Sequence, residues 1–238
     1  MRMFFLRGIR IVMLLHIASL LTAEEARDAR ALLDSARWED GRRTAGHRAQ
    51  GVKRNEQLPP DSVEAQQLGA LIGDRLGRNA TFLAAALPLR VMPPQFNRYA
   101  GGGAYGAHVD NAIFPVPGAN VSVRSDVSMT IFLSEPDDYD GGELVIQDMF
   151  GEQVVKLPAG DAVLYPGSSL HRVAPVTRGV RLASFLWAQS LVPQDHRRRM
   201  LYDLDLSIQA LGADHPDHAS VDSLTHVYHN LLREWSST

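Results

Sequence analysis

Short apolar segments closed by glycine or proline occupy most of the chain between residues 127 and 189. Short strands at regular spacing with Gly/Pro turns are typical of a β-sandwich or a β-barrel. This pattern constrains the fold more than any other feature of the sequence. The expected strands are 127–133, 143–147, 154–157, 162–165, 171–176 and 180–189.

Just before these strands, the segment 99–110 ends in His108-Val109-Asp110. On an extended chain, side chains two residues apart point to the same side, so His108 and Asp110 can face one point. A His-x-Asp tripeptide alone is weak evidence, because it often arises by chance. Two histidines and one carboxylate are, however, the ligand set of non-haem Fe(II) oxygenases. We expect His171, on a later strand, to be the third ligand.

Arg181 lies on the last predicted strand and shares one face of it with an alanine and two aromatic residues. Burying an arginine among such neighbours is costly without an anionic partner. A guanidinium matches a carboxylate with two parallel hydrogen bonds. Arg172 and Arg178 are rival cations, but Arg172 points away from the face of His171, and Arg178 falls in a turn.

A buried metal among short strands predicts a mainly β protein with flanking helices and a double-stranded β-helix core, the jelly-roll or cupin-like architecture. We expect the core domain to span 78–191. An N-terminal helical segment covers 13–77, and a C-terminal helical segment covers 192–238. Residues 1–12 are expected to be an extension or to follow from a mis-assigned start.

The beginning of the chain has two interpretations. Basic residues, an apolar stretch and Ala23 resemble a secretory signal peptide, but Leu21 occupies a position where a small residue is wanted. Alternatively, Met13–Ile17 is a first strand, and Thr22 to Glu25 form a capping box that opens a helix. We favour the second interpretation.

Apolar residues at helical spacing predict helices at 24–36 and 61–76, with Asp61 as the cap of the second. The apolar run Phe82–Val91 predicts a buried strand. Two further helices are expected in the C-terminal segment. The arginine run Arg197–Arg199 is expected on the outer face of the first of them.

Gly101–Gly103 is expected to form a tight turn or a mobile loop beside the site, because no Lys-Ser/Thr follows to complete a phosphate loop. The loop Pro115–Asn120 is a candidate lid over the open metal face. His47 is expected in a solvated loop. Four further histidines are spaced by three but lack a completed metal motif, which favours the surface: His215, His218, His226 and His229.

The residues around these motifs resemble the bacterial PKHD-type hydroxylases, which are related to prolyl and lysyl hydroxylases. The resemblance covers residues 13–238 and rests on matching order, spacing and flanking text. The matching runs are F-N-R-Y, Y-G-x-H-V-D, Y-D-G-G-E-L, L-P-A-G-D, L-Y-P-x-S-S-L-H, T-R-G-V-R-x-A-S-F and Y-H-N-L-L-R-E-W.

This resemblance implies an Fe(II)- and 2-oxoglutarate-dependent dioxygenase that uses O2, with ascorbate as the reductant that restores Fe(II). It places the arginine that binds 2-oxoglutarate at Arg181. Related hydroxylases use a tyrosine of the glycine-rich stretch to contact 2-oxoglutarate, which implies Tyr99. Packing of Tyr99 against the barrel is the alternative.

Composition narrows the function classes. The net charge of −3 gives no basic bias of the kind found in nucleic-acid-binding proteins. The chain has no cysteine, which excludes disulfides and thiolate metal sites and favours nitrogen and oxygen ligands. The N-terminal apolar run is too short to span a membrane. We therefore expect a cytoplasmic protein without nucleic-acid or membrane partners.

Three function classes fit these residues. The leading one is a hydroxylase acting on an unidentified substrate, either a peptidyl residue or a small metabolite such as an iron-related one. The second is a non-catalytic cupin-like sensor that binds iron or 2-oxoglutarate and acts through a partner protein. The third is a cupin enzyme with another metal, which would not need Arg181. The helical segments fit a substrate wall or a homo-oligomer interface.

Overall fold

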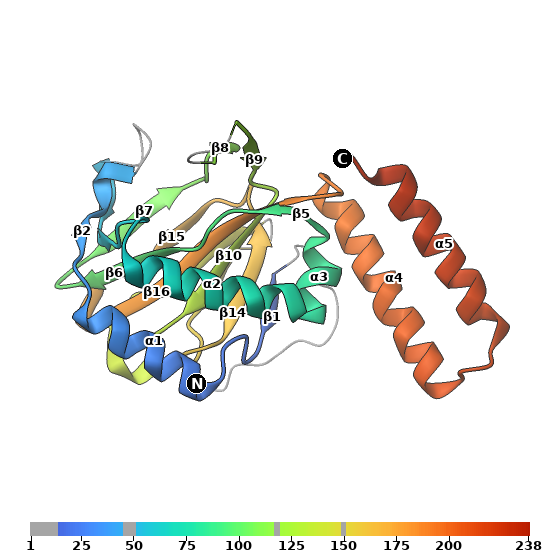
Figure 1. The fold of residues 1–238 in the computed structure, drawn as a ribbon, viewed down its shortest axis with the longest axis horizontal. Coiled ribbons are helices and arrows are strands. Elements are labelled where there is room, and N and C mark those ends of the chain that lie inside the picture. The colour runs from blue at the N-terminus through green and yellow to red at the C-terminus, as the bar shows by residue number, and fades with distance from the viewer. Residues whose placement is uncertain (1–13, 45–50, 117–119, 149–150) are drawn as a thin grey trace.

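A computed structural model describes residues 14–44, 51–116, 120–148 and 151–238. Two antiparallel sheets face each other, and helices pack against the outer face of the larger one (Figure 1). This is the predicted double-stranded β-helix core with flanking helices. The N-terminal extension 1–12 and His47 lie outside the described residues.

The larger sheet contains nine strands within the described part of the chain. Its main path is β1-β14-β10-β16-β6-β4-β2, and β5 and β11 also pair with β16. The bounds are β1 (Leu15–Ile17), β2 (Glu39–Asp40), β4 (Glu56–Gln57), β5 (Pro88–Val91), β6 (Gln95–Ala100), β10 (Val127–Phe132), β11 (Tyr139–Gly141), β14 (Ala162–Pro166) and β16 (Val176–Ser190).

The smaller sheet has the order β13-β12-β15-β7-β3, and β8 pairs with β9 beside it. The bounds are β3 (Lys53–Arg54), β7 (Ala104–His108), β8 (Ile113–Pro115), β9 (Ser122–Arg124), β12 (Leu144–Asp148), β13 (Gly151–Val155) and β15 (His171–Val173). Strands β1 to β4 come from the expected helical segment 13–77, so this segment contributes to both sheets. The expected domain limits stay a prediction.

The helices cover one face of the larger sheet and extend beyond one end of it (Figure 1). Apolar residues of α1 and α2 share a core with the outward residues Met129 and Ile131 of β10. In the described residues, no helix combines the length and the apolar character needed to cross a membrane. The bounds are α1 (Ala23–Ser35), α2 (Val63–Arg78), α3 (Ala80–Ala86), α4 (Asp195–Asp214) and α5 (Ala219–Trp235), with 3₁₀ turns at Gly41–Thr44 and Pro136–Asp138.

All residues of strand β10 are buried, although polar and apolar residues alternate along it. Met129 and Ile131 belong to the core shared with the helices, and Ser128 and Thr130, together with part of Met129, line a cavity between the two sheets. Polar residues at every second position therefore point into the protein and not into solvent. The inner face of β10 is therefore a polar surface within the protein.

The strand and capping box predicted near the start of the described chain are confirmed. Thr22 Oγ1 accepts from Glu25 N at 3.2 Å, and Glu25 Oε2 accepts from Thr22 N at 2.9 Å. His16, which interrupts the apolar run, has a carboxylate partner, because its Nε2 lies 2.7 Å from Asp161 Oδ2. These contacts fix β1 and the start of α1 against the sheet.

The predicted strand Phe82–Val91 is wrong over its first half, where helix α3 forms. Asn79 caps this helix, because its Oδ1 accepts from Phe82 N at 2.8 Å. The sequence A-T-F-L-A-A-A is rich in the strongest helix former, and this local preference prevails. Leu87, in a left-handed conformation with φ of 43°, ends the helix before β5.

Two smaller predictions are also wrong. Ser62, and not Asp61, caps α2, because Ser62 Oγ accepts from Ala65 N at 3.2 Å. Arg198 is 1% exposed and donates to the carbonyls of Val192, Pro193 and Asp126. It lies three residues before the buried Leu201, so the helical period turns it towards the core and not outward.

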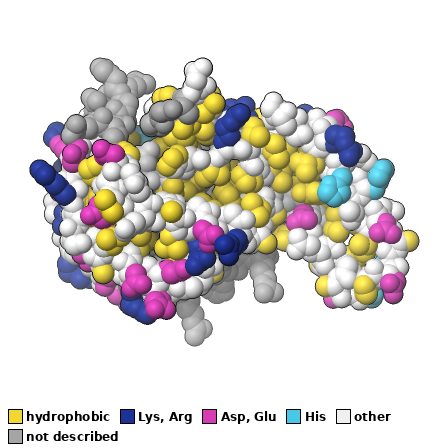
Figure 2. Space-filling model, viewed as in Figure 1, with side chains coloured by type: hydrophobic (Ala, Val, Ile, Leu, Met, Phe, Trp, Pro, Cys, Tyr) yellow, Lys and Arg dark blue, Asp and Glu magenta, His cyan; other side chains and the backbone are white. Residues whose placement is uncertain are grey.

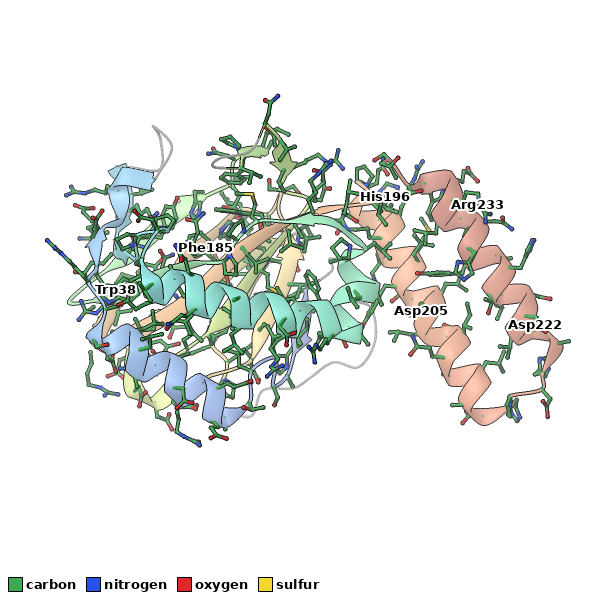
Figure 3. All side chains as sticks on the ribbon, viewed as in Figure 1. Trp38, Phe185, His196, Asp205, Asp222 and Arg233 are labelled. Atoms are coloured by element: carbon green, nitrogen blue, oxygen red, sulfur yellow. The ribbon has the colours of Figure 1, made fainter. Side chains whose placement is uncertain are left out.

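Helices α4 and α5 form a hairpin beyond the end of the sheets (Figure 1). Asp205 and Asp222 lie on this hairpin, away from the sheets that carry Phe185 (Figure 3). Figure 2 shows apolar side chains along the middle of the molecule, where α3 and β5 meet the base of α4. The hairpin is fixed there by a cluster of Leu87, Val192 and Leu201 with partly buried residues of α5. The four C-terminal histidines are exposed, as predicted.

The ion pair between Glu25 and Arg75 joins α1 to α2. Hydrogen bonding to Arg75 lowers the pKa of Glu25 to about 2. Glu25→Gln keeps a cap acceptor but loses the charge, and we expect it to lower the free energy of unfolding by about 0.5–1 kcal/mol at pH 7. A depressed carboxyl pKa stabilises the fold above the unfolded-state pKa, so this difference should shrink as the pH falls from 4.5 towards 2.

Urea unfolding at several pH values measures this difference, with the exposed Glu24→Gln as the matched control. A Glu25→Gln difference that stays constant between pH 7 and pH 2.5 would contradict the assignment.

Candidate active site

The predicted ligands His108, Asp110 and His171 converge in the smaller sheet where β7 ends and β15 begins. His108 and His171 are direct cross-strand partners in the antiparallel pair β7–β15. Asp110 follows β7, and its Oδ1 lies 3.9 Å from His108 Nε2 and 3.8 Å from His171 Nε2. One ligand atom from each residue lies within 4.8 Å of the others. These three side chains can hold one metal ion.

Backbone carbonyls orient both imidazoles. His108 Nδ1 donates to Gly106 O at 2.8 Å, and His171 Nδ1 donates to Ser169 O at 3.0 Å. Fixing Nδ1–H on a carbonyl leaves the Nε2 lone pair directed at the centre, as is common for metal-ligating histidines. Burial and the neighbouring His171 lower the pKa of His108 to about 4, so this imidazole is neutral at neutral pH.

Asp110 is held in a comparable way by a residue that sequence reasoning missed. Ser128 Oγ donates to Asp110 Oδ2 at 2.7 Å, which leaves Oδ1 facing the histidines. Ser128 is 1% exposed and comes from β10, in the opposite sheet. The alternation of polar and apolar residues along β10 was a signal for such an inward serine.

Two tyrosines shield the histidines. The Tyr105 ring stacks on His108 with a centroid distance of 3.6 Å, and Tyr165 meets His171 edge-on at 5.2 Å. Burial raises the pKa of both phenols, so they remain protonated at neutral pH. The ligand atoms therefore lie in a shielded environment beside the cavity between the sheets.

Arg181 lies on β16 and lines the same cavity as the three candidate ligands. It is 2% exposed, and its Cζ lies 5.2 Å from the Tyr99 ring centroid and 5.5 Å from that of Phe132. Its Nε has no hydrogen-bond partner among the described residues. A guanidinium that is buried with an unpaired donor is expensive unless an anion binds to it.

The D-G-G-E-L run makes room for this arginine. Gly142 has a φ of 68°, and an added Cβ would meet Arg181 Cδ at 3.0 Å. An added Cβ on Gly141 would collide with Pro175 O at 2.0 Å. Both glycines are therefore needed for the turn that lets Arg181 lie in the cavity.

The rival cations are engaged elsewhere. Arg172 forms a two-pronged ion pair with Glu152, at 2.5 and 2.7 Å, and Arg178 pairs with Asp140 at 2.7 and 2.9 Å. Both pairs are exposed. Neither arginine lines the cavity.

The remaining predicted elements frame the cavity. Tyr99, on β6, lines it and is 1% exposed. Gly101 and Gly102 have positive φ values and form the predicted turn between β6 and β7. In the expected lid Pro115–Asn120, residues 117–119 lie outside the described residues. Phe114, just before it, stacks on Trp187 with a centroid distance of 3.9 Å.

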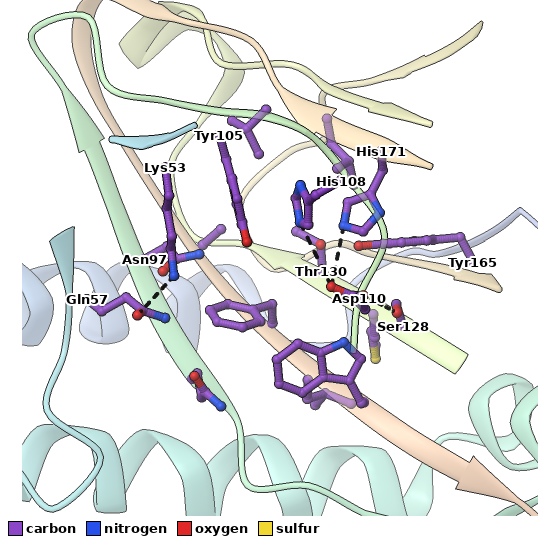
Figure 4. Close-up of a pocket in the computed structure, with 18 of the residues that line it drawn as sticks. Lys53, Gln57, Asn97, Tyr105, His108, Asp110, Ser128, Thr130, Tyr165 and His171 are labelled. Carbon is purple, nitrogen blue, oxygen red and sulfur yellow. Dashed lines mark hydrogen bonds and ion pairs between the residues drawn. The ribbon is translucent and has the colours of Figure 1, made fainter. Parts of the chain in front are cut away.

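A second group of cavity residues was not predicted from the sequence. Lys53, Gln57 and Asn97 line the cavity on the side of Tyr105 away from His108 (Figure 4). The run K-R-N-E-Q is polar at every position, so hydrophobic periodicity could not show that alternate residues face inward. Lys53 is 4% exposed, although its neighbour Arg54 lies at the surface.

Comparisons with known proteins agree with this geometry. The 2OG-Fe(II) oxygenase superfamily model matches residues 94–189, and the PKHD-type hydroxylase C-terminal domain model matches residues 195–237. The chain is 58% identical to a PKHD-type hydroxylase of Delftia acidovorans over 224 residues, which cover 94% of this chain and 99% of the relative. This chain belongs to the PKHD-type hydroxylase family. It is therefore an Fe(II)- and 2-oxoglutarate-dependent dioxygenase.

Solved structures share the fold of this PKHD-type hydroxylase at low identity. A prolyl-4-hydroxylase of Pseudomonas putida superposes with a TM-score of 0.51 at 22% identity, covering 76% of this chain and 94% of that one. HygX of Streptomyces hygroscopicus, solved with nickel, 2-oxoglutarate and hygromycin B, gives 0.51 at 17% identity, with coverages of 76% and 84%. At these identities the likeness concerns the fold alone.

Ser128→Ala should weaken metal binding, because it frees Asp110 Oδ2 without touching a candidate ligand. We expect an affinity for Mn(II) about 10-fold lower than that of the wild type, measured by calorimetry. Ser184→Ala is the control, since this buried hydroxyl bonds to Gln95 O and does not line the cavity. Equal affinities in Ser128→Ala and the wild type would show that the contact does not orient Asp110.

Proposed function

We propose that His108, Asp110 and His171 hold the Fe(II) of this hydroxylase and that Arg181 binds the distal carboxylate of 2-oxoglutarate. The main evidence for this proposal is that the three candidate metal ligands and Arg181 line the same cavity. The donor set suits the metal, since two imidazole nitrogens and one carboxylate oxygen form the facial triad of non-haem iron oxygenases. The buried Arg181, with an unpaired Nε in the described structure, suits a dicarboxylate.

When bound, iron with 2-oxoglutarate and O2 supplies an oxidant able to convert an unactivated C–H into C–OH, with release of succinate and CO2. The protein's own contribution is position and exclusion of water. Ser128 and two backbone carbonyls hold the ligand side chains before metal arrives, and Arg181 fixes the far end of the co-substrate. The rings of Tyr105, Tyr165 and Trp187 shield the cavity from water.

Tyr99 is proposed to contact 2-oxoglutarate as well. Its ring lies beside the Arg181 guanidinium, and burial keeps its phenol protonated by raising its pKa. It could therefore donate to a carboxylate that Arg181 binds. We also propose ascorbate as the reductant that restores Fe(II), and the cytoplasm as the compartment, because it supplies 2-oxoglutarate and reduced iron.

The test is succinate formation from 2-oxoglutarate by the purified protein, supplied anaerobically with Fe(II) and ascorbate and then exposed to air. We expect slow succinate formation without a prime substrate. His108→Ala should reduce it to background. Arg181→Ala should reduce it roughly 30-fold or more at low 2-oxoglutarate, because a buried charge pair loses one partner.

Arg172→Ala and Arg178→Ala are matched controls, since both remove an exposed arginine that forms its own ion pair. Both should retain wild-type rates. An Arg181→Ala protein with unchanged dependence on 2-oxoglutarate would refute the carboxylate clamp. Tight binding of Fe(II) and 2-oxoglutarate without any succinate would favour a sensor acting through a partner. The expected substrate-wall and homo-oligomer roles of the helices stay predictions.

A further inference from the structure

The cavity has a polar wall that the proposed iron and 2-oxoglutarate sites do not use. It consists of Lys53, Gln57 and Asn97, from strands β3, β4 and β6, and their exposed fractions are 4%, 6% and 7%. Strand β3 pairs with β7 of the smaller sheet, and β4 pairs with β6 of the larger one. The segment 53–57 therefore crosses between the sheets and closes this side of the cavity.

The wall lies close to the candidate metal centre. Lys53 Nζ lies 5.3 Å from the Tyr105 ring centroid, and the other face of that ring stacks on His108 at 3.6 Å (Figure 4). The distance from Nζ to the His108 ring is thus no greater than the sum of these two values. A group bound to Lys53 would be a few bonds from a carbon presented to the metal.

The chemistry of the wall is specific. Lys53 Nζ donates to Gln57 Oε1 at 3.1 Å, which fixes the direction of the ammonium group. Asn97 Nδ2 donates to Tyr99 OH at 3.3 Å, and Asn97 Oδ1 is buried without a hydrogen-bond partner in the described part of the chain. The wall thus presents one cationic donor and, near it, one amide acceptor.

Lys53 carries charge in the free protein. Burial lowers its pKa to about 8, while Asp110 acts in the opposite direction. The Lys53 amine is therefore mostly in its protonated, ammonium form at pH 7. A single ammonium beside an acceptor suits a monoanion better than a phosphate dianion, which prefers several converging donors.

The rest of the cavity is apolar and aromatic. Phe114 stacks on Trp187 at 3.9 Å, and Phe185 meets Trp187 edge-on at 5.4 Å. All three side chains line the cavity. This surface would bury an apolar body attached to the anionic group.

We propose that Lys53, Gln57 and Asn97 form the recognition site for a prime substrate that carries a carboxylate beside an N–H or O–H donor. The carboxylate pairs with Lys53, and the donor satisfies Asn97 Oδ1. This assignment rests on the proposed function, in which Arg181, and not Lys53, binds the carboxylate of 2-oxoglutarate. Acylated amino acids and 2-hydroxy acids with an apolar side chain have the required chemistry.

The experiment compares each acid with its uncharged methyl ester. The probes are N-acetyl-leucine, N-acetyl-phenylalanine and 3-phenyllactate, each with its ester, and dissociation constants are measured by ligand-observed NMR on the Zn(II)- and 2-oxoglutarate-loaded protein. We expect at least one acid to bind about 10-fold more tightly than its ester, since a charged hydrogen bond is lost in the ester. Lys53→Met should reduce this ratio to about one, and Lys53→Arg should retain a preference for the acid.

Arg54→Met is the matched control, because Arg54 is the next residue of the same strand and faces solvent. It should keep the wild-type ratio. Acids that bind no more tightly than their esters to the wild-type protein, or that do not bind at all, would overturn the proposal without any variant. A ratio that survives in Lys53→Met would overturn it too. Succinate formation by the wild type tests the proposed function separately, since it needs none of these probes.

Discussion

The cross-strand pairing of His108 with His171 is the constraint on which the rest of this structure depends. The side chains of direct partners on an antiparallel pair project from the same face of the sheet. This register therefore brings the ring centroids of the two imidazoles to 4.3 Å from each other. The extended Val109 step then brings Asp110 to the same point. A one-residue slip between β7 and β15 would turn one histidine away and abolish the site. The second sheet closes over this pair and supplies Ser128 and Arg181.

Much of this arrangement could be predicted from sequence. Period-two spacing and Gly/Pro turns predicted the strands around His171 and Arg181, because strands with one apolar face carry a readable alternation. The same reasoning placed His108 and Asp110 on one face, and the structure brings all three candidate ligands together. Arg181 could be singled out because an arginine among apolar neighbours on one strand face is unusual. The capping box at Thr22 and Glu25 was a local signal, and local signals are the most transferable.

The remainder depended on tertiary contacts that no local pattern encodes. Lys53 lies in a run that is polar on both faces, so its inward direction follows only from the pairing of β3 with β7. Arg198 resembles a surface residue in the sequence, but it donates to the carbonyls of the nearby Val192 and Pro193 and to that of Asp126, which lies 72 residues away along the chain. The apolar run at Phe82 fits a strand or a helix equally well by composition, and the cap at Asn79 decides for the helix. Sequence reasoning therefore located the candidate iron ligands better than the residues proposed to select a substrate.

We propose that one cavity binds Fe(II) through His108, Asp110 and His171 and binds 2-oxoglutarate through Arg181. Anaerobic titration of the Fe(II)-loaded protein with 2-oxoglutarate, followed by visible absorption, tests it most directly. Chelation of iron by a 2-oxo acid creates a metal-to-ligand charge-transfer band. We predict a saturable band in the wild type that needs much more 2-oxoglutarate in Arg181→Met and is absent in His171→Ala. A wild-type protein that binds Fe(II) but gives no band at saturating 2-oxoglutarate would contradict the claim.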